Sequence, residues 1–352
     1  MLTKKAGRIT PPRFSIRIKR ERSIMMTTIK TAPIEIGPKQ THWFQRFIQR
    51  EATAFYGFIS LWLLGFVFLQ VFPMVATLVA SFTNYNGFDL SSTAFIGLSN
   101  YREAFQSPDA WYTMRQTFIY TLLSIPLSIV VALGLAILLN KKIPGRGAFR
   151  TAFYLPTMIP IGATALVFKS ILDGNFGFLN LFISLFRKGT VINWINNYGL
   201  YCLVAIAVWG CGTMMIIFLA GLQNIPEELL EAAEIDGANK GQIFLHITWP
   251  LLTPITYFQI MLAIINALQM FLPASVMAQA HDPNSFWNPW YSMFVFPGYA
   301  LQQILSFQRF GYGTALLWIL FVIILAIALI VRKTSTSWVH YAVEQEGRSG
   351  KQ

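Results

Sequence analysis

Residues 224–250 read NIPEELLEAAEIDGANKGQIFLHITWP, and an apolar stretch long enough to cross a bilayer lies on each side of them. Proline fits the first turn of a helix, acids there complement the helix dipole, and glycine favours a left-handed helix end. We therefore expect one helix between Pro226 and Gly237, and a second short helix that starts near Gly241 and runs into Trp249. The segment contains a single basic residue and five acids: Glu227, Glu228, Glu231, Glu234 and Asp236.

The whole chain contains six apolar stretches of the length that a membrane-spanning helix needs, about 20 residues. They cover residues 57–80, 117–140, 148–171, 200–222, 251–272 and 313–331. The only charged residues within them, Arg150 and Lys169, lie near the two ends of the third stretch. Of the 352 residues, 55% are apolar and 12% are charged, whereas a soluble domain carries about 25% charged residues. The sequence therefore predicts an all-α, polytopic membrane protein with six transmembrane helices.

The distribution of Lys and Arg predicts the orientation of these stretches, because cytoplasmic loops carry the excess of basic residues. With the N-terminus inside, the inner segments hold twenty-one Lys and Arg residues and the outer segments hold six. Both termini are therefore predicted to be cytoplasmic. We expect a basic N-terminal tail (1–56), a six-helix transmembrane domain (57–332) with the acidic loop 223–250 on its cytoplasmic side, and a cytoplasmic C-terminal tail (333–352).

The formal net charge of +12 is concentrated in the first 56 residues, which contain twelve Lys and Arg residues and three Glu. A basic segment beside an apolar body is typical of a tail at the membrane surface rather than of a nucleic-acid-binding surface. An organellar transit peptide is also disfavoured, because four prolines interrupt any sustained amphipathic helix in this segment. These prolines are Pro11, Pro12, Pro33 and Pro38.

The spacing within the acidic segment is more specific than its composition. Glu231-Ala232-Ala233 is followed after three residues by Gly237, and after nine more by Ile247-Thr248-Trp249-Pro250. This arrangement resembles the EAA motif of binding-protein-dependent ABC import permeases, E-A-A-x3-G-x9-I-x-L-P, with Trp249 in place of Leu. Other stretches resemble the carbohydrate subfamily of these permeases (maltose, glycerol-phosphate and multiple-sugar type): 81–83 (SFT), 97–101 (GLSNY), 145–150 (GRGAFR), 154–156 (YLP), 220–226 (AGLQNIP) and 310–315 (FGYGTA).

The resemblance implies a type I ABC importer permease fold, in a bacterial inner-membrane importer that moves a sugar or oligosaccharide into the cytoplasm. The expected partners are a second permease chain in a heterodimer, two cytoplasmic ATPase subunits and an extracytoplasmic solute-binding protein. ATP hydrolysis is expected on the ATPase subunits and no cofactor on this chain, which lacks the phosphate-binding motif G-x-x-x-x-G-K-[ST]. Coupling to the ATPase is expected from residues of the motif: Glu231, Ala232, Ala233, Asp236, Gly237, Ile247 and Pro250.

Other functional classes fit the residues less well. An ion-coupled secondary transporter usually keeps ionisable residues inside the membrane, and none lies centrally in the six stretches. A metal-dependent or nucleophilic intramembrane enzyme is disfavoured, so no catalytic or metal-binding residue is predicted: Cys202 and Cys211 lie roughly 13 Å apart along one helix, and all four histidines lie outside the stretches. A secondary transporter and a non-sugar ABC permease are kept as alternatives.

A sugar is held by hydrogen-bonding side chains and aromatic faces rather than by charges. In the fifth stretch, Gln259, Asn266 and Gln269 follow one another at spacings of seven and three, and are predicted to share one helix face. The resemblance to maltose-type permeases, which contact sugar from the fourth and fifth spans, makes both spans candidates for the substrate pathway. Helix–helix packing through small and polar residues is the alternative. The candidate pathway residues are Trp209, Gly210, Thr213, Gln259, Asn266 and Gln269.

Overall fold

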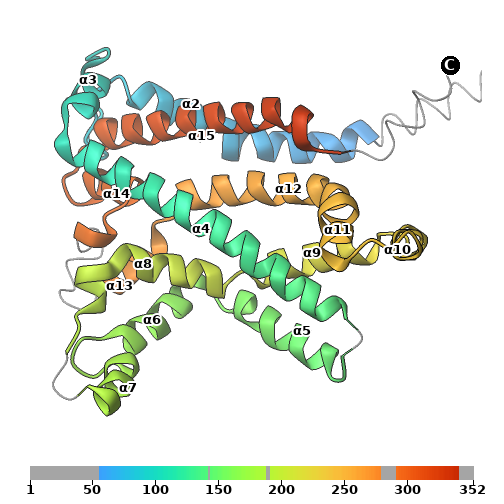
Figure 1. The fold of residues 1–352 in the computed structure, drawn as a ribbon. Coiled ribbons are helices and arrows are strands. Elements are labelled where there is room, and N and C mark those ends of the chain that lie inside the picture. Colours follow the sequence, from blue (N-terminus) through green and yellow to red (C-terminus); the bar gives the residue numbers. More distant parts are fainter. Residues whose placement is uncertain (1–54, 142, 188–190, 279–290, 341–352) are drawn as a thin grey trace, which may run out of the picture. The chain divides into compact units, whose positions relative to one another are not determined.

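The computed structural model describes residues 55–141, 143–187, 191–278 and 291–340, and the remaining residues are drawn in grey in Figure 1. Nearly all of the predicted N-terminal tail, and the last part of the C-terminal tail, therefore lie outside the described residues. The chain divides into two compact units, residues 1–64 and 65–352. In the first unit, residues 55–64 are helical, and the helices labelled below belong to the second unit.

The described residues form helices joined by loops, and their only β pairing is an isolated bridge between Thr83 and Phe95. This confirms the predicted all-α class. The α-helices are α2 (Phe72–Ala80), α3 (Ser99–Gln106), α4 (Pro108–Asn140), α5 (Arg146–Tyr154), α6 (Ile161–Leu172), α7 (Phe178–Phe186), α8 (Trp194–Trp209), α9 (Gly212–Gln223), α10 (Glu227–Ile235), α11 (Lys240–Ile243), α12 (Trp249–Leu268), α13 (Leu272–Ala278), α14 (Phe296–Leu305) and α15 (Phe310–Trp338). Short 3₁₀ or π-helical turns adjoin them: η1 (Val67–Val71), η2 (Leu155–Met158), η3 (Phe244–Thr248) and η5 (Tyr291–Met293).

Four continuous helical segments are long and apolar enough to cross a membrane: Phe55–Ala80, Pro108–Asn140, Lys240–Leu268 and Phe310–Trp338. Two bent pairs meet the same criteria when each pair is counted as one span: Arg146–Met158 with Ile161–Leu172, and Trp194–Trp209 with Gly212–Gln223. The described residues therefore contain up to six spans, in agreement with the predicted number. The fifth span begins eleven residues earlier than expected, because α11, η3 and α12 are continuous.

The third and fourth spans are broken, which corrects the expectation of one straight helix for each. In the third, the two parts meet at 99°. Ile159 has extended backbone angles, because the residue before a proline, here Pro160, is sterically driven out of the helical region. In the fourth, α8 and α9 meet at 42° across Gly210 and Cys211. The ψ angles of these two residues, 11° and 6°, are not helical.

The longest described helix, α4, packs against two helices that precede the acidic segment, α8 and α9, and two that follow it, α12 and α14 (Figure 1). It begins nine residues before the predicted start of its apolar stretch. The side chain of Ser107 accepts a hydrogen bond from the backbone N–H of Ala110 at 3.3 Å, and Pro108 occupies the first turn. The polar residues of this extra length therefore form a capped helix start rather than a loop.

Three clusters of buried apolar side chains hold the helices together. The first lies mainly among α4, α6, α8 and α13, and the second mainly among α4, α12, α14 and α15. The third joins the C-terminal half of α4 to α9 and α12, with Phe218 and Leu252 fully buried. Leu230 and Phe244 pack against this third cluster from the acidic segment. The acidic segment is therefore anchored where α4, α9 and α12 meet.

Candidate functional site

The acidic segment folds as a helical elbow, the name used here for residues 224–250. Its first helix, α10, starts directly after Pro226, has Glu227 and Glu228 in its first turn, and buries no residue. It ends at Gly237, whose φ of +82° is a left-handed conformation that costs glycine little. The N–H of Gly237 donates to Glu234 O at 3.1 Å, and that of Ala238 donates to Ala233 O at 2.9 Å. These two bonds form a Schellman motif and confirm the predicted helix end.

The second helix of the elbow is joined rigidly to the fifth span. Its N-cap residue, Asn239, accepts a hydrogen bond from the backbone N–H of Gln242 at 3.0 Å, and the Gln242 side chain accepts from the Asn239 N–H at 2.8 Å. This reciprocal capping box starts the helix at Lys240, slightly earlier than predicted. Because the helix continues to Leu268 without a break, a force applied to the elbow is transmitted directly to α12.

The exposed surface of the elbow combines acidic and apolar side chains. Glu231, Ala232 and Asp236 are exposed, and within the described part of the chain no acid of α10 forms an ion pair. Leu229 and Ile235, on the same helix, are 46% and 86% exposed. Among the other predicted coupling residues, Gly237 is exposed, whereas Ala233, Ile247 and Pro250 are half-buried. A basic and apolar surface of another protein would complement this face.

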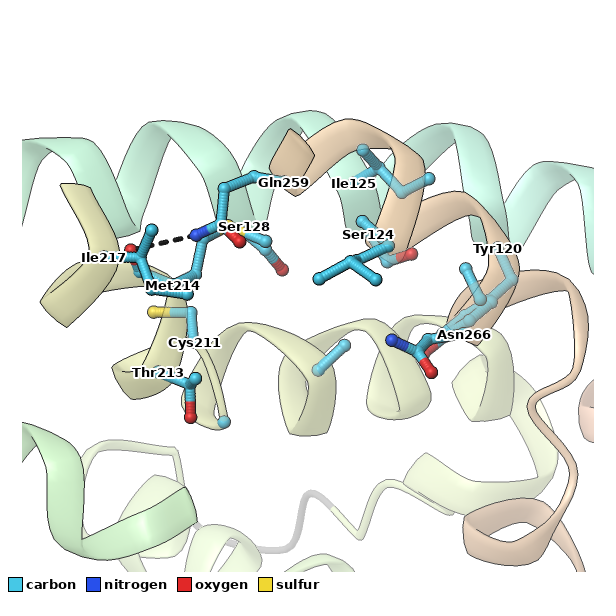
Figure 2. Close-up of a pocket in the computed structure, with 15 residues that line it drawn as sticks. Tyr120, Ser124, Ile125, Ser128, Cys211, Thr213, Met214, Ile217, Gln259 and Asn266 are labelled. Carbon is cyan, nitrogen blue, oxygen red and sulfur yellow. Dashed lines mark hydrogen bonds between the residues drawn. The ribbon is translucent and has the colours of Figure 1, made fainter. Parts of the chain in front are cut away.

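A second feature is a cavity of about 320 Å³ between α4, the junction of α8 with α9, and α12 (Figure 2). Its polar side chains carry hydroxyl and amide groups, and no charged residue lines it. Gln259 is almost completely buried and donates from Nε2 to the carbonyl oxygen of Met214 at 3.1 Å. This bond joins α12 to α9 across the cavity wall. The polar lining residues are Tyr120, Ser124, Ser128, Thr213, Gln259 and Asn266.

The cavity brings together four of the six predicted pathway residues: Gly210, Thr213, Gln259 and Asn266. Trp209 is not among the lining residues, and its ring packs edge-on against Phe168 with the ring centroids 5.5 Å apart. Gln269 lines a different cavity, of about 530 Å³, together with residues of α14 and α15. Helix α12 ends at Leu268, four residues before the predicted boundary, and Gln269 is its C-cap residue. The three amides are therefore divided between two cavities.

The sequence interpretation missed the contribution of α4 to this cavity. Tyr120, Ser124 and Ser128 follow one another at spacings of four, so they lie along one face of α4. Hydroxyl groups at every fourth position of a membrane-spanning helix are a readable signal for a polar lining. The sequence carries this signal in the second span, whereas the predicted pathway residues lie in the fourth and fifth spans.

Comparisons with known proteins show the family of the chain. The pattern of the family described as "Binding-protein-dependent transport system inner membrane component" matches residues 116–346. The chain is 37% identical to the "Probable ABC transporter permease protein YesP" of Bacillus subtilis (strain 168) over 305 residues, covering 86% of this chain and 96% of the relative. It is 33% identical to the "Arabinooligosaccharides transport system permease protein AraP" of the same organism over 320 residues, covering 89% and 99%.

A solved structure gives an independent comparison of the fold. It is described as a "bacterial alginate ABC transporter in complex with alginate pentasaccharide-bound periplasmic protein", and one of its chains is similar to this chain with a TM-score of 0.70. The sequence identity is 21%, and the match covers 82% of this chain and 96% of that chain. The two chains share a fold.

Proposed function

Since this chain belongs to the family of binding-protein-dependent transport system inner membrane components, we propose that it is the permease subunit of an ATP-driven importer that moves a sugar or oligosaccharide into the cytoplasm. The observation that carries the proposal is the rigid, exposed elbow on a membrane chain that has no phosphate-binding loop of its own. In this proposal, Glu231, Ala232, Ala233, Asp236, Gly237, Ile247 and Pro250 form the contact with an ATPase subunit.

The chemistry of the cavity supports a neutral substrate. Hydroxyl and amide side chains donate and accept hydrogen bonds as sugar hydroxyls require, and the absence of charged lining residues disfavours an anionic sugar. The relative AraP is described as a transporter of arabinooligosaccharides, which fits this chemistry. We therefore assign the substrate pathway to Gly210, Thr213, Gln259 and Asn266, with Tyr120, Ser124 and Ser128 added from α4.

The complete importer is proposed to contain this chain, a second permease chain, two ATPase subunits and an extracytoplasmic solute-binding protein. Both termini and the elbow are placed on the cytoplasmic side, where ATP is available, and the excess of Lys and Arg in the inner segments supports this orientation. The apolar helices and the family support a multi-pass membrane protein, and the proposed location is the bacterial inner membrane.

The proposal predicts uptake that depends on ATP and not on an ion gradient. The purified complex would be reconstituted in vesicles containing ATP, and a solute-binding protein loaded with radiolabelled arabinooligosaccharide would be added outside. We expect uptake with ATP, none with a non-hydrolysable analogue, and no effect of a protonophore. An anionic uronate oligosaccharide is the matched comparison and should be transported poorly. Uptake driven by a proton gradient without ATP would identify a secondary transporter instead.

The cavity assignment predicts different results for two amides that lie three residues apart, Asn266 and Gln269. Replacing Asn266 with leucine removes one hydrogen-bonding group from the cavity, which is worth about 1 kcal/mol, or about fivefold in apparent affinity for transport. Replacing Gln269 with leucine changes the other cavity and should alter the apparent affinity less than about twofold. Initial uptake rates over a range of substrate concentrations measure both values. Equal effects of the two substitutions would remove Asn266 from the pathway.

A further inference from the structure

The hydroxyl group of Thr253 joins the beginning of the fifth span to the chain just beyond the sixth. Proline has no backbone N–H, so Pro254 leaves the carbonyl oxygen of Pro250 without its usual helical hydrogen bond. Thr253 Oγ1 donates to that oxygen at 2.6 Å. The same Oγ1 accepts a hydrogen bond at 2.9 Å from the backbone N–H of His340, which follows the end of α15. The name C-terminal clasp is used here for Pro250, Thr253 and His340.

The residues around the clasp hold the end of α15 against α12. Thr253 and Val339 are both buried. Val339 has extended backbone angles, so the chain leaves the helix before it reaches His340. The ring of Trp338 packs edge-on against that of Tyr257, one turn after Thr253, with the ring centroids 6.2 Å apart. The hydroxyl of Thr253 therefore both donates and accepts within a packed contact, and its loss would leave the N–H of His340 without this acceptor.

The clasp and a cluster of apolar side chains join α12 to α15 at different levels. Ile264 and Leu268, near the end of α12, belong to the second buried cluster together with Leu316 and Leu320 of the first half of α15. The clasp instead joins the first turns of α12 to the end of α15. It includes Pro250, the last residue of the elbow, and the helical segment from the elbow to Leu268 is continuous. A movement of the elbow therefore reaches α15 at the clasp as well as α12.

We propose that Thr253 is a positioning residue for transport, because it fixes the C-terminal end of α15 to the elbow. The inference rests on the proposed contact between the elbow and an ATPase subunit, and it adds the sixth span to the parts that this contact moves. Packed helices can slide past one another by small distances, and hydrogen bonds at one end oppose such sliding. Without the clasp, some cycles of ATP hydrolysis would move α12 without α15 and transport no solute.

The acceptor side of the clasp is tested in the reconstituted importer by measuring ATP hydrolysis together with uptake of radiolabelled arabinooligosaccharide. Thr253→Val keeps the shape of the side chain and removes the hydroxyl. We expect it to raise the ATP hydrolysed per solute transported at least about threefold, within the value of one hydrogen bond. Thr253→Ser restores the hydroxyl and should restore the wild-type ratio. Thr256→Val is the matched control, because Thr256 is equally buried and its hydroxyl donates at 3.0 Å to Leu252 O of the same helix.

The donor side of the clasp is tested at His340, an exposed residue. His340→Pro removes the backbone N–H, and Val339 already has the extended angles that a residue before proline adopts. His340→Ala changes the same side chain but keeps the N–H, so it is the matched control. We expect His340→Pro to raise the ratio of hydrolysis to transport as Thr253→Val does, and His340→Ala to behave as the wild type. Both variants leave α12 unchanged, so they do not depend on whether the Thr253 variants fold.

Hydrogen exchange of the His340 amide tests the clasp without ATP or a solute. In the resting complex, we expect exchange to be at least about fivefold faster in Thr253→Val than in the wild type or in Thr256→Val. Equal exchange in these three proteins would overturn the inference. Equal ratios of hydrolysis to transport would also overturn it, because a purely structural role lowers hydrolysis and uptake together. Wild-type uptake that needs no ATP would instead contradict the proposed function.

Discussion

Replacing Glu231 with lysine is expected to abolish ATP-driven uptake while the chain still inserts into the membrane. Glu231 is exposed on α10, beside Leu229 and Ile235, and contributes nothing to the buried clusters. The substitution therefore leaves the fold intact. In the proposed contact between the elbow and a basic surface of an ATPase subunit, a positive charge at this position costs several kcal/mol, so that contact should weaken by more than about a hundredfold. Uptake into vesicles, the ATPase rate, and the amount of ATPase that co-purifies with the permease measure the effect.

Two other substitutions separate loss of the contact from a general effect of charge. Glu231→Gln keeps the shape of the side chain and removes its charge, so it should reduce uptake less than the lysine variant does. Asp89→Lys makes the same change of charge in an exposed loop between α2 and α3 and should leave uptake unchanged. If the Glu231→Lys variant still couples ATP hydrolysis to uptake, the elbow is not the element that receives the ATPase movement.

The spans could be predicted from sequence because bilayer thickness fixes their length, but the breaks within them could not. Pro126 and Pro254 lie inside α4 and α12, and both helices continue through them. Pro160 instead accompanies a 99° bend. The same residue type therefore occurs in a straight helix and at a sharp turn, and the neighbouring packing determines which conformation forms. A close pair of prolines does not mark the bend either, because Pro250 and Pro254 have the same spacing as Pro156 and Pro160 and lie in the continuous segment Lys240–Leu268.

The two parts of the candidate site differ in how much could be predicted. The helix end at Gly237 follows from local backbone chemistry, so the sequence was sufficient to place it. The cavity is formed by α4, the junction of α8 with α9, and α12, which are distant in sequence, and packing sets the face that α4 turns toward α9 and α12. Gln269 lines a different cavity from Gln259 and Asn266, together with residues of α14 and α15, and the packing of those two helices could not be predicted from the sequence either.

The second large effect, a loss of thermal stability, is expected when one methyl group is added at Gly212, where α9 packs against α5. A Cβ atom added to Gly212 would overlap the carbonyl oxygen of Phe153 and lie 3.0 Å from Tyr154 Cα. Both are backbone atoms, so no side-chain rotation can relieve the contact, and α5 must move away from α9. Overpacking of this kind costs about 3 kcal/mol, so Gly212→Ala should lower the melting temperature of the purified complex by roughly 6 °C or more.

Gly221 provides a matched comparison on the same helix. A Cβ atom there would also overlap a neighbour, but the nearest atom is Cδ1 of Ile255, the far end of a flexible side chain. Rotation of that side chain can accommodate the methyl group, so Gly221→Ala should shift the melting temperature by less than about 2 °C, equivalent to less than 1 kcal/mol. Because the two substitutions add the same group to the same helix, helix propensity cancels from the comparison. Equal melting temperatures for the two variants would mean that α5 is not held against α9 by backbone contact at Gly212, and that the bend in the third span is free to move independently of the fourth.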